Sequence, residues 1–340
     1  SFRHVTLTSR KHLHRLESFY QYKCGGKMKP KILLIGGWGW AATSPLVYTL
    51  QRNAKYAHFG YSKTFRYYGD INDPVYRDYR KKSLIRKYNM ICDGTWENFE
   101  KGKPSTHHMN HTRDLEPLRD FSLDHLHKLM SGDPTISKYM DFYHALHDHV
   151  ITKGYKSLGD GCMGRFHVYN SREDAIKYSE TLKSEFDVKV LIIARDPVRR
   201  AFSHYLYQIE VIIHKKRGKC DLPRQIKFID YLKELRAIQS YYGKDNVYVT
   251  VMEELWERDG ATGLSEFLEH PITNLWKNLY APDIGHLCKH DDDVPCQGFG
   301  QHLLELTPEM YWHYRKKSNH IYEDWKKVFG SLPLHWGEPL

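Results

Sequence analysis

An arginine and a serine, eight positions apart, form the pair whose types and spacing point most directly to chemistry in this sequence. Arg195 directly follows the apolar run Val188–Ala194, and Ser203 lies about two helical turns beyond Pro197. Proline is common in the first turn of a helix, so the pattern predicts a strand, a short turn and then a helix. A guanidinium at the end of the strand and a hydroxyl on the helix can converge on one phosphate group. The alternative is an arginine-rich helix start that is simply solvated.

A second candidate anion site is a glycine-rich stretch that follows the first apolar run of the chain. The run Lys31–Ile35 is typical of a buried parallel strand, and Thr43-Ser44-Pro45 predicts the start of a helix that continues to about Arg52. Backbone N–H groups and a helix N-terminus meet in such a turn, so it can hold phosphate or sulfate. The alternative is a plain tight turn, because neither a Walker A loop nor a dinucleotide fingerprint is present. The residues that we expect to bind the anion here are Gly37, Gly39, Trp40, Ala42, Thr43 and Ser44.

Together, these two segments resemble the nucleotide-binding motifs of the sulfotransferase superfamily, whose members use 3′-phosphoadenosine 5′-phosphosulfate (PAPS). The segment Arg195–Tyr205 is similar to the family's 3′-phosphate motif, with Arg195 and Ser203 at the phosphate-contacting positions. The stretch Gly37–Leu46 resembles the 5′-phosphosulfate loop, whose usual form is Gly-x-x-Lys-x-Gly-Thr-Thr/Ser-x-Leu. The resemblance implies an enzyme that transfers a sulfuryl group from PAPS, without a metal ion. The acceptor would be a hydroxyl of a carbohydrate or of another small or aromatic molecule.

Three further stretches resemble the carbohydrate branch of the family, in particular the heparan-sulfate-type enzymes. They are His58–Tyr68, Val249–Leu255 and the region that runs from Cys288 through Cys296 to Tyr322. The likeness implies a disulfide loop between Cys288 and Cys296, and hence a secretory compartment such as the Golgi lumen. A sequon at Asn110 fits a glycoprotein of that compartment. The alternative location is the cytoplasm.

Two positions depart from the family's usual pattern, and both concern the transfer step. Sulfuryl transfer needs a base that takes the acceptor proton and a cation that stabilises charge on the leaving phosphate. Trp40 stands where the family has the loop lysine, and Thr64 stands where the heparan-type branch has its glutamate. A neutral indole and a weakly basic hydroxyl cannot perform these tasks. Either other residues carry them, or the chain binds nucleotide without ordinary transfer. The candidates are Lys63 or Arg66 for the cation and His58, Asp70 or Asp160, the last in a predicted Gly-Asp-Gly turn, for the base.

Composition leaves other classes of function open. The chain carries 51 Lys and Arg residues against 41 Asp and Glu residues, and the net charge of +10 favours an anionic partner. A module that binds the nucleotide or an anionic glycan without catalysis would fit this charge. A nucleic-acid-binding protein would rest on charge alone, since no motif of that class is present. We therefore expect no nucleic acid partner. Two histidine-rich clusters lack a standard zinc spacing, so we expect no metal ion.

The elements that must position these residues alternate between strands and helices. A third apolar run, Asn246–Met252, precedes a predicted helix around Gly263–Glu269, whereas the polar residues 70–155 predict helices and loops over the sheet. This alternation predicts a three-layer α/β domain with a central parallel sheet, and the resemblance implies the P-loop-kinase-like sulfotransferase fold. Ligands of such sheets bind at the carboxyl ends of the strands, where both candidate anion sites fall.

We predict a single domain at residues 31–330, because no shift in composition divides it. Residues 1–30 would form an N-terminal arm with one helix at Lys11–Tyr22, and residues 331–340 a C-terminal tail. The sequence begins at Ser1 rather than Met, which is compatible with removal of an N-terminal membrane anchor.

Overall fold

The computed structural model describes residues 28–37, 46–47, 49–60, 82, 85–86, 89, 121–161, 172–214, 226–256, 261–272, 280–281, 286–287, 306–333 and 335–338. The strands are β1 (Lys31–Gly37), β2 (Ala57–His58), β3 (Ser157–Asp160), β4 (Asp187–Ala194), β5 (Val247–Val251), β6 (Tyr280–Ala281) and β7 (His286–Leu287). The α-helices are α7 (Leu123–Met130), α8 (Ile136–Thr152), α9 (Arg172–Glu185), α10 (Pro197–His214), α11 (Tyr231–Tyr242), α12 (Thr262–Leu268), α13 (Pro308–Lys317) and α14 (Asn319–Phe329). Shorter helical turns are η1 (Thr49–Asn53), η2 (Lys244–Asn246) and η3 (Glu253–Trp256).

Five strands form a central sheet in the order β2-β3-β1-β4-β5, and every neighbouring pair is parallel. Strands β1, β4 and β5 correspond to the three apolar runs that predict strands, so the α/β class with a central parallel sheet is confirmed. Strands β2 and β3 were not predicted. Asp160, which was expected in a turn, is instead the last residue of β3.

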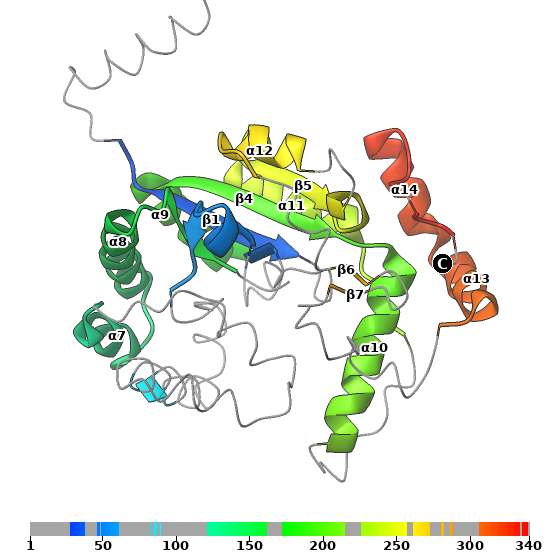
Figure 1. Ribbon diagram of the computed structural model, residues 1–340, viewed down its shortest axis with the longest axis horizontal. Helices are drawn as coiled ribbons and strands as arrows, with labels where there is room; N and C mark the ends of the chain where they lie inside the picture. The colour runs from blue at the N-terminus through cyan, green and yellow to red at the C-terminus, as the bar shows by residue number, and fades with distance from the viewer. Residues whose placement is uncertain are drawn as a thin grey trace, which may run out of the picture.

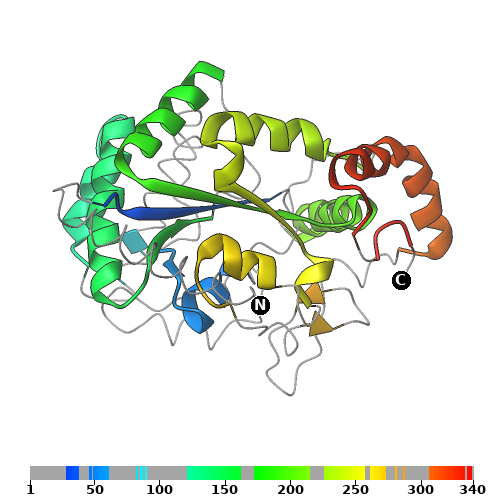
Figure 2. The same cartoon turned by 90° about the horizontal axis from the view of Figure 1, so that it is seen from above.

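Helices cover both faces of this sheet, as Figure 2 shows. Side chains alternate between the two faces along a strand, and each face of β1 and β4 therefore belongs to a different core. One core contains Ile32, Leu34, Val190 and Ile192 together with apolar residues of α8, α9 and α11. The other contains Leu33, Ile35, Leu191 and Ile193 together with Leu46, Leu50 and apolar residues of α12. Burial on both faces explains why these strands are continuous apolar runs in the sequence.

The helices that follow β4 and β5 begin close to where the sequence predicts them. Helix α10 starts at Pro197, as expected, and continues to His214. Helix α12 lies at Thr262–Leu268. Figure 1 shows α10 beyond the end of the sheet, beside α13, and these two helices are in contact. The carboxyl end of β4 is therefore next to the C-terminal helices.

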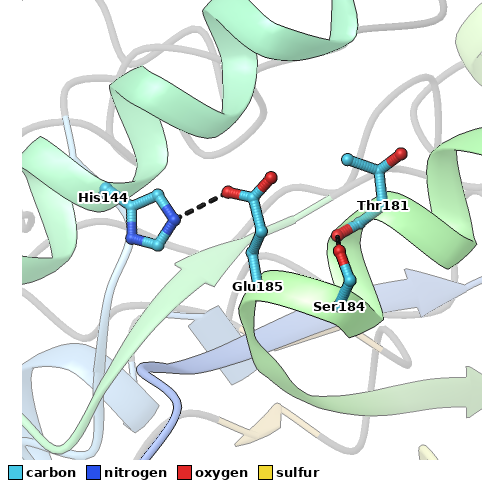
Figure 3. Close-up of polar contacts among 4 residues, drawn as sticks. All are labelled: His144, Thr181, Ser184 and Glu185. Carbon is cyan, nitrogen blue, oxygen red and sulfur yellow. Dashed lines mark hydrogen bonds and ion pairs between the residues drawn. The ribbon is translucent and has the colours of Figure 1, made fainter. Parts of the chain in front are cut away.

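Helices α8 and α9 are linked by a polar pair at their surface (Figure 3). His144 Nε2 lies 2.7 Å from Glu185 Oε2, and the His144 ring stacks on Phe186 with centroids 4.5 Å apart. Within α9, Ser184 Oγ donates to the carbonyl oxygen of Thr181 at 2.7 Å. The His144 and Glu185 side chains are 40% and 35% exposed, so we expect the pair to contribute about 1 kcal/mol or less.

The short strand β3 depends on a glycine that has no room for a side chain. A Cβ atom on Gly159 would lie 2.5 Å from Cε1 of Phe59, a residue that is fully buried. We expect Gly159→Ala to lower the free energy of unfolding by about 1–3 kcal/mol, because the Phe59 ring or the backbone must shift. Urea unfolding of both proteins measures this. An unchanged stability would contradict the close approach of β3 to Phe59.

Several predicted features lie outside the described residues. These are the N-terminal arm as far as residue 27, all six cysteines and the sequon at Asn110. Within the part of the chain that the structure describes, no helix combines the length and the apolar character needed to cross a membrane.

Candidate functional site

Three parallel strands end side by side and bring distant segments of the chain to one edge of the sheet. Gly37, the last residue of β1, pairs with Ile193 of β4, and Ala194 at the end of β4 pairs with Val251 of β5. Arg195 therefore follows β4 directly beside the glycine-rich end of β1. This is the edge at which open parallel sheets bind their ligands.

The arginine and the serine that the sequence pairs are brought together at this edge. Arg195 Nη1 donates to Ser203 Oγ at 3.0 Å, across two turns of α10. Arg195 is only 7% exposed, whereas Ser203 is partly exposed. Ser203 accepts this bond, so the proton of the same hydroxyl can be donated to a ligand oxygen. We refer to Arg195 and Ser203 as the phosphate clamp. Phosphate binding by this pair remains a prediction.

The peptide unit that joins Arg195 to Asp196 is held at both of its polar ends. Tyr231 donates its hydroxyl proton to the carbonyl oxygen of Arg195 at 2.7 Å. The N–H of Asp196 donates to Glu253 Oε1 at 3.1 Å. Burial raises the pKa of the Glu253 carboxyl, and the charge of Arg195 opposes that rise. Burial likewise lowers the pKa of the Arg195 guanidinium, and Glu253 opposes the decrease. The two charges thus stabilise each other in a buried environment.

The carboxylate of Asp196 is fully buried and accepts five hydrogen bonds. Oδ1 accepts the backbone N–H groups of Val198 and Arg199, each at 3.0 Å, and so caps the first turn of α10. Oδ2 accepts the hydroxyls of Tyr311 and Tyr322, each at 2.9 Å. The fifth bond comes from the N–H of Gly337 at 3.2 Å. Burial raises the pKa of both tyrosine hydroxyls, so they remain protonated donors.

Further contacts join the end of the chain to the same site. Trp336 Nε1 donates to Glu253 Oε2 at 3.0 Å. Arg199 Nη2 donates to the carbonyl oxygen of Glu338 at 2.6 Å, and its guanidinium lies 5.7 Å from the centre of the Tyr311 ring. Trp336, which lies within the predicted C-terminal tail at residues 331–340, is only 4% exposed.

His58, a candidate for the base, is fully buried at the end of β2. Its Nδ1 accepts the N–H of Gly60 at 2.9 Å, and its ring lies edge-on to Tyr155 at a centroid distance of 4.8 Å. A neutral imidazole has one acceptor nitrogen, and here that nitrogen is used within the fold. This arrangement does not favour His58 as the group that takes a proton from an acceptor.

Asp160, the second described candidate for the base, is also enclosed. It is 1% exposed, and its Oδ2 accepts the hydroxyl of Tyr143 at 2.7 Å. The Tyr143 hydroxyl lies 3.3 Å from that of Tyr178. Asp160 pairs with Leu34, which is three residues before the end of β1. The carboxylate therefore lies deeper in the sheet than the strand ends that carry the phosphate clamp.

Most of the remaining predicted site residues lie outside the described part of the chain. Of the glycine-rich stretch, Gly37 is described as the end of β1. The predicted residues outside the described part of the chain are Gly39, Trp40, Ala42, Thr43, Ser44, Lys63, Thr64, Arg66 and Asp70. Among the described residues, no group of three or more His, Cys, Asp and Glu side chains is arranged to hold a metal ion.

No role was predicted for five residues from other parts of the chain that contact Arg195, Asp196 or one another at this edge. They are Tyr231, Glu253, Tyr311, Tyr322 and Trp336. The signal that could have found them is weak, since buried tyrosine and tryptophan usually place their polar atoms against a hydrogen-bond partner. That rule identifies donors, but it does not identify the acceptor.

No protein-family model matches this sequence, and no curated protein matches it. Among solved structures, the chain is similar to a sulfotransferase from Alicyclobacillus acidocaldarius, at 13% identity and a TM-score of 0.45, over 91% of this chain and 99% of that chain. It is similar to the sulfotransferase domain from the curacin biosynthetic pathway, at 12% identity and a TM-score of 0.43, over 75% of this chain and 80% of that chain. It is also similar to the sulfotransferase domain from the Synechococcus PCC 7002 olefin synthase. The identity is 14% and the TM-score 0.41, over 90% of this chain and 98% of that chain.

Proposed function

We propose that this protein is a sulfotransferase that moves a sulfuryl group from PAPS to a hydroxyl of a carbohydrate or of another small or aromatic acceptor. The observation that carries the proposal is the hydrogen bond between Arg195 and Ser203 at the carboxyl edge of a parallel sheet. The same two residues occupy the phosphate-contacting positions of the motif that the sequence resembles. A solvated helix start would not need a buried guanidinium bonded to a hydroxyl two turns away.

The charges and donors of the site fit a phosphorylated nucleotide. Arg195 offers a planar cationic donor set, and Ser203 offers a neutral hydroxyl, which together suit the oxygens of a phosphate monoester. Gly37 ends the neighbouring strand, where the glycine-rich stretch begins. PAPS carries one phosphate on its 3′ oxygen and a phosphosulfate on its 5′ oxygen, and two adjacent anion sites would match that pattern. The nucleotide supplies the sulfuryl group, while the chain binds and orients it.

The direct test is titration of the protein with adenosine 3′,5′-bisphosphate (PAP), the desulfated product of PAPS, followed by a transfer assay. We expect saturable PAP binding and movement of label from ³⁵S-labelled PAPS to a member of a panel of carbohydrate and phenolic acceptors. A protein that binds no PAP would contradict the proposal. PAP binding without transfer to any acceptor would favour the alternative considered next.

A second candidate function, nucleotide binding without ordinary transfer, is favoured by the described base candidates. His58 uses its acceptor nitrogen within the fold, and Asp160 is enclosed beside Tyr143. The usual cation and base positions hold Trp40 and Thr64. We favour retained transfer through other residues, because the chain keeps the phosphate clamp intact.

A comparison of wild type with Trp40→Lys and Thr64→Glu, singly and together, separates the two functions. If other residues have taken over, wild type should transfer sulfate, and Trp40→Lys should disturb the altered site and lower that transfer. If nothing has replaced the missing groups, wild type should show no sulfate transfer. The double variant should then gain transfer, by about tenfold or more over background, because it restores a cation beside the leaving phosphate. The readout is label transferred from ³⁵S-labelled PAPS. A silent wild type that the double variant revives would contradict our preference.

A further inference from the structure

We propose that the C-terminal segment, made of α13, α14 and the turn at residues 335–338, positions the phosphate clamp. In this view Tyr322 and Trp336 are positioning residues for Arg195, which they influence through Asp196 and Glu253. The inference rests on the proposed function, because it concerns how the same nucleotide site is held.

The C-terminal segment converges on Asp196, the residue after Arg195. Three donors of this segment reach Asp196 Oδ2, namely the hydroxyls of Tyr311 and Tyr322 and the N–H of Gly337. The other oxygen of the same carboxylate caps α10, the helix that carries Ser203. One buried side chain therefore links the C-terminal segment to the helix that bears half of the clamp.

The backbone of Arg195 is also fixed by residues from other parts of the chain. The Arg195–Asp196 peptide unit is fixed through its carbonyl oxygen by Tyr231 and through its N–H by Glu253. The orientation of this peptide unit sets the ψ angle of Arg195, and the backbone angles limit the rotamers that its side chain can adopt. Any residue that holds Tyr231 or Glu253 in place therefore also controls the direction of the clamp.

Trp336 contacts both of the residues that hold this peptide unit. Its indole N–H donates to Glu253 Oε2 at 3.0 Å, and its ring centre lies 6.0 Å from that of Tyr231. The ring also packs against Trp325 and Tyr322, with centroid distances of 4.6 Å and 6.2 Å. The turn at residues 335–338 is thus joined, by a hydrogen bond and by an aromatic cluster, to the residues that hold the Arg195–Asp196 peptide unit.

Polar bonds to two buried carboxylates have a directional role that apolar packing lacks. Apolar side chains of similar volume could stabilise the junction of α10, α11 and α14 about as well. Hydrogen bonds with fixed donors instead select one orientation of the acceptor group. We therefore expect loss of a C-terminal donor to change the preference of the clamp for a ligand with the 3′-phosphate, in addition to any change in stability.

The experiment measures the preference of the protein for the 3′-phosphate. Isothermal titration gives Kd for PAP and for adenosine 5′-phosphate, which lacks that group, and their ratio is the preference. The variants are Tyr322→Phe and Trp336→Phe, each of which removes one donor and keeps an aromatic ring. Tyr314→Phe is the matched control, because Tyr314 lies on α13 but its hydroxyl is not among the five donors to Asp196.

We expect both variants to lower the preference by about three- to tenfold, the size of one lost hydrogen bond, while the control leaves it unchanged. In an Arg195→Ala background neither variant should lower it further, because the two changes act through the same contact. Equal weakening of both nucleotides, or no change in the ratio, would overturn the positioning role. If wild type shows no preference, or Arg195→Ala retains it, the proposed function itself fails and the inference falls with it. Tyr322→Phe alone suffices for the test if Trp336→Phe does not fold.

Discussion

Replacing Arg195 with alanine should weaken the binding of PAP by about ten- to a hundredfold, the cost of one charge-assisted and bidentate phosphate contact. The guanidinium is buried, directed at Ser203 and held in place by the peptide unit that follows it. The substitution removes the positive charge and the fork geometry of the guanidinium together. Isothermal titration of both proteins with PAP measures the change.

Two companion substitutions show whether the loss comes from the contact. Ser203→Ala should weaken PAP binding less than Arg195→Ala, since it removes a neutral hydroxyl. Arg195→Lys should give an intermediate value, since it keeps a positive charge but cannot bind two oxygens side by side. The unfolding midpoint of each variant is the control for stability. If Arg195→Ala binds PAP as tightly as wild type, this edge of the sheet is not the nucleotide site.

The parts of the fold that were predictable are those with a strong local signal. Strands β1, β4 and β5 are continuous apolar runs because both faces of the sheet are covered, and each run is followed by glycine, proline or a helix pattern. Strands β2 and β3 lack that signal. Ala57–His58 has two residues, and Ser157–Asp160 contains a glycine and an aspartate that are typical of turns. Strand β3 pairs with β1, and β2 pairs with β3, and this pairing is what makes them strands.

The candidate site likewise has a part that the local sequence predicts and a part that it does not. Arg195 directly follows β4, and Ser203 lies eight residues later on the next helix, so their meeting follows from local geometry. The groups that hold Arg195 are remote in sequence. Tyr322 is 126 residues from Asp196, and Trp336 is 83 residues from Glu253. No periodicity or spacing encodes such contacts, because they depend on how the C-terminal helices pack against α10 and α11.

The largest loss of stability is expected at Asp196. Asp196→Ala leaves five donors without their acceptor, and four of them are buried, namely two N–H groups in the first turn of α10 and the hydroxyls of two tyrosines. Each buried donor that loses its partner costs about 1–3 kcal/mol, although relaxation recovers part of the sum. We therefore expect the free energy of unfolding to fall by at least about 3 kcal/mol, which urea unfolding measures.

Asp230→Ala is the matched control, since Asp230 also precedes a helix but is exposed and accepts one bond from the N–H of Lys233. It should cost only about 1 kcal/mol, the usual value for the loss of a helix cap. The loss of stability caused by Asp196→Asn should lie between the losses caused by Asp196→Ala and Asp230→Ala. Its amide oxygen can still cap α10 and the tyrosine hydroxyls can turn to accept from its NH₂ group, but the N–H of Gly337 cannot. If Asp196→Ala costs no more than Asp230→Ala, the carboxylate acts only as a cap, and the C-terminal helices are not tied to the phosphate clamp through it.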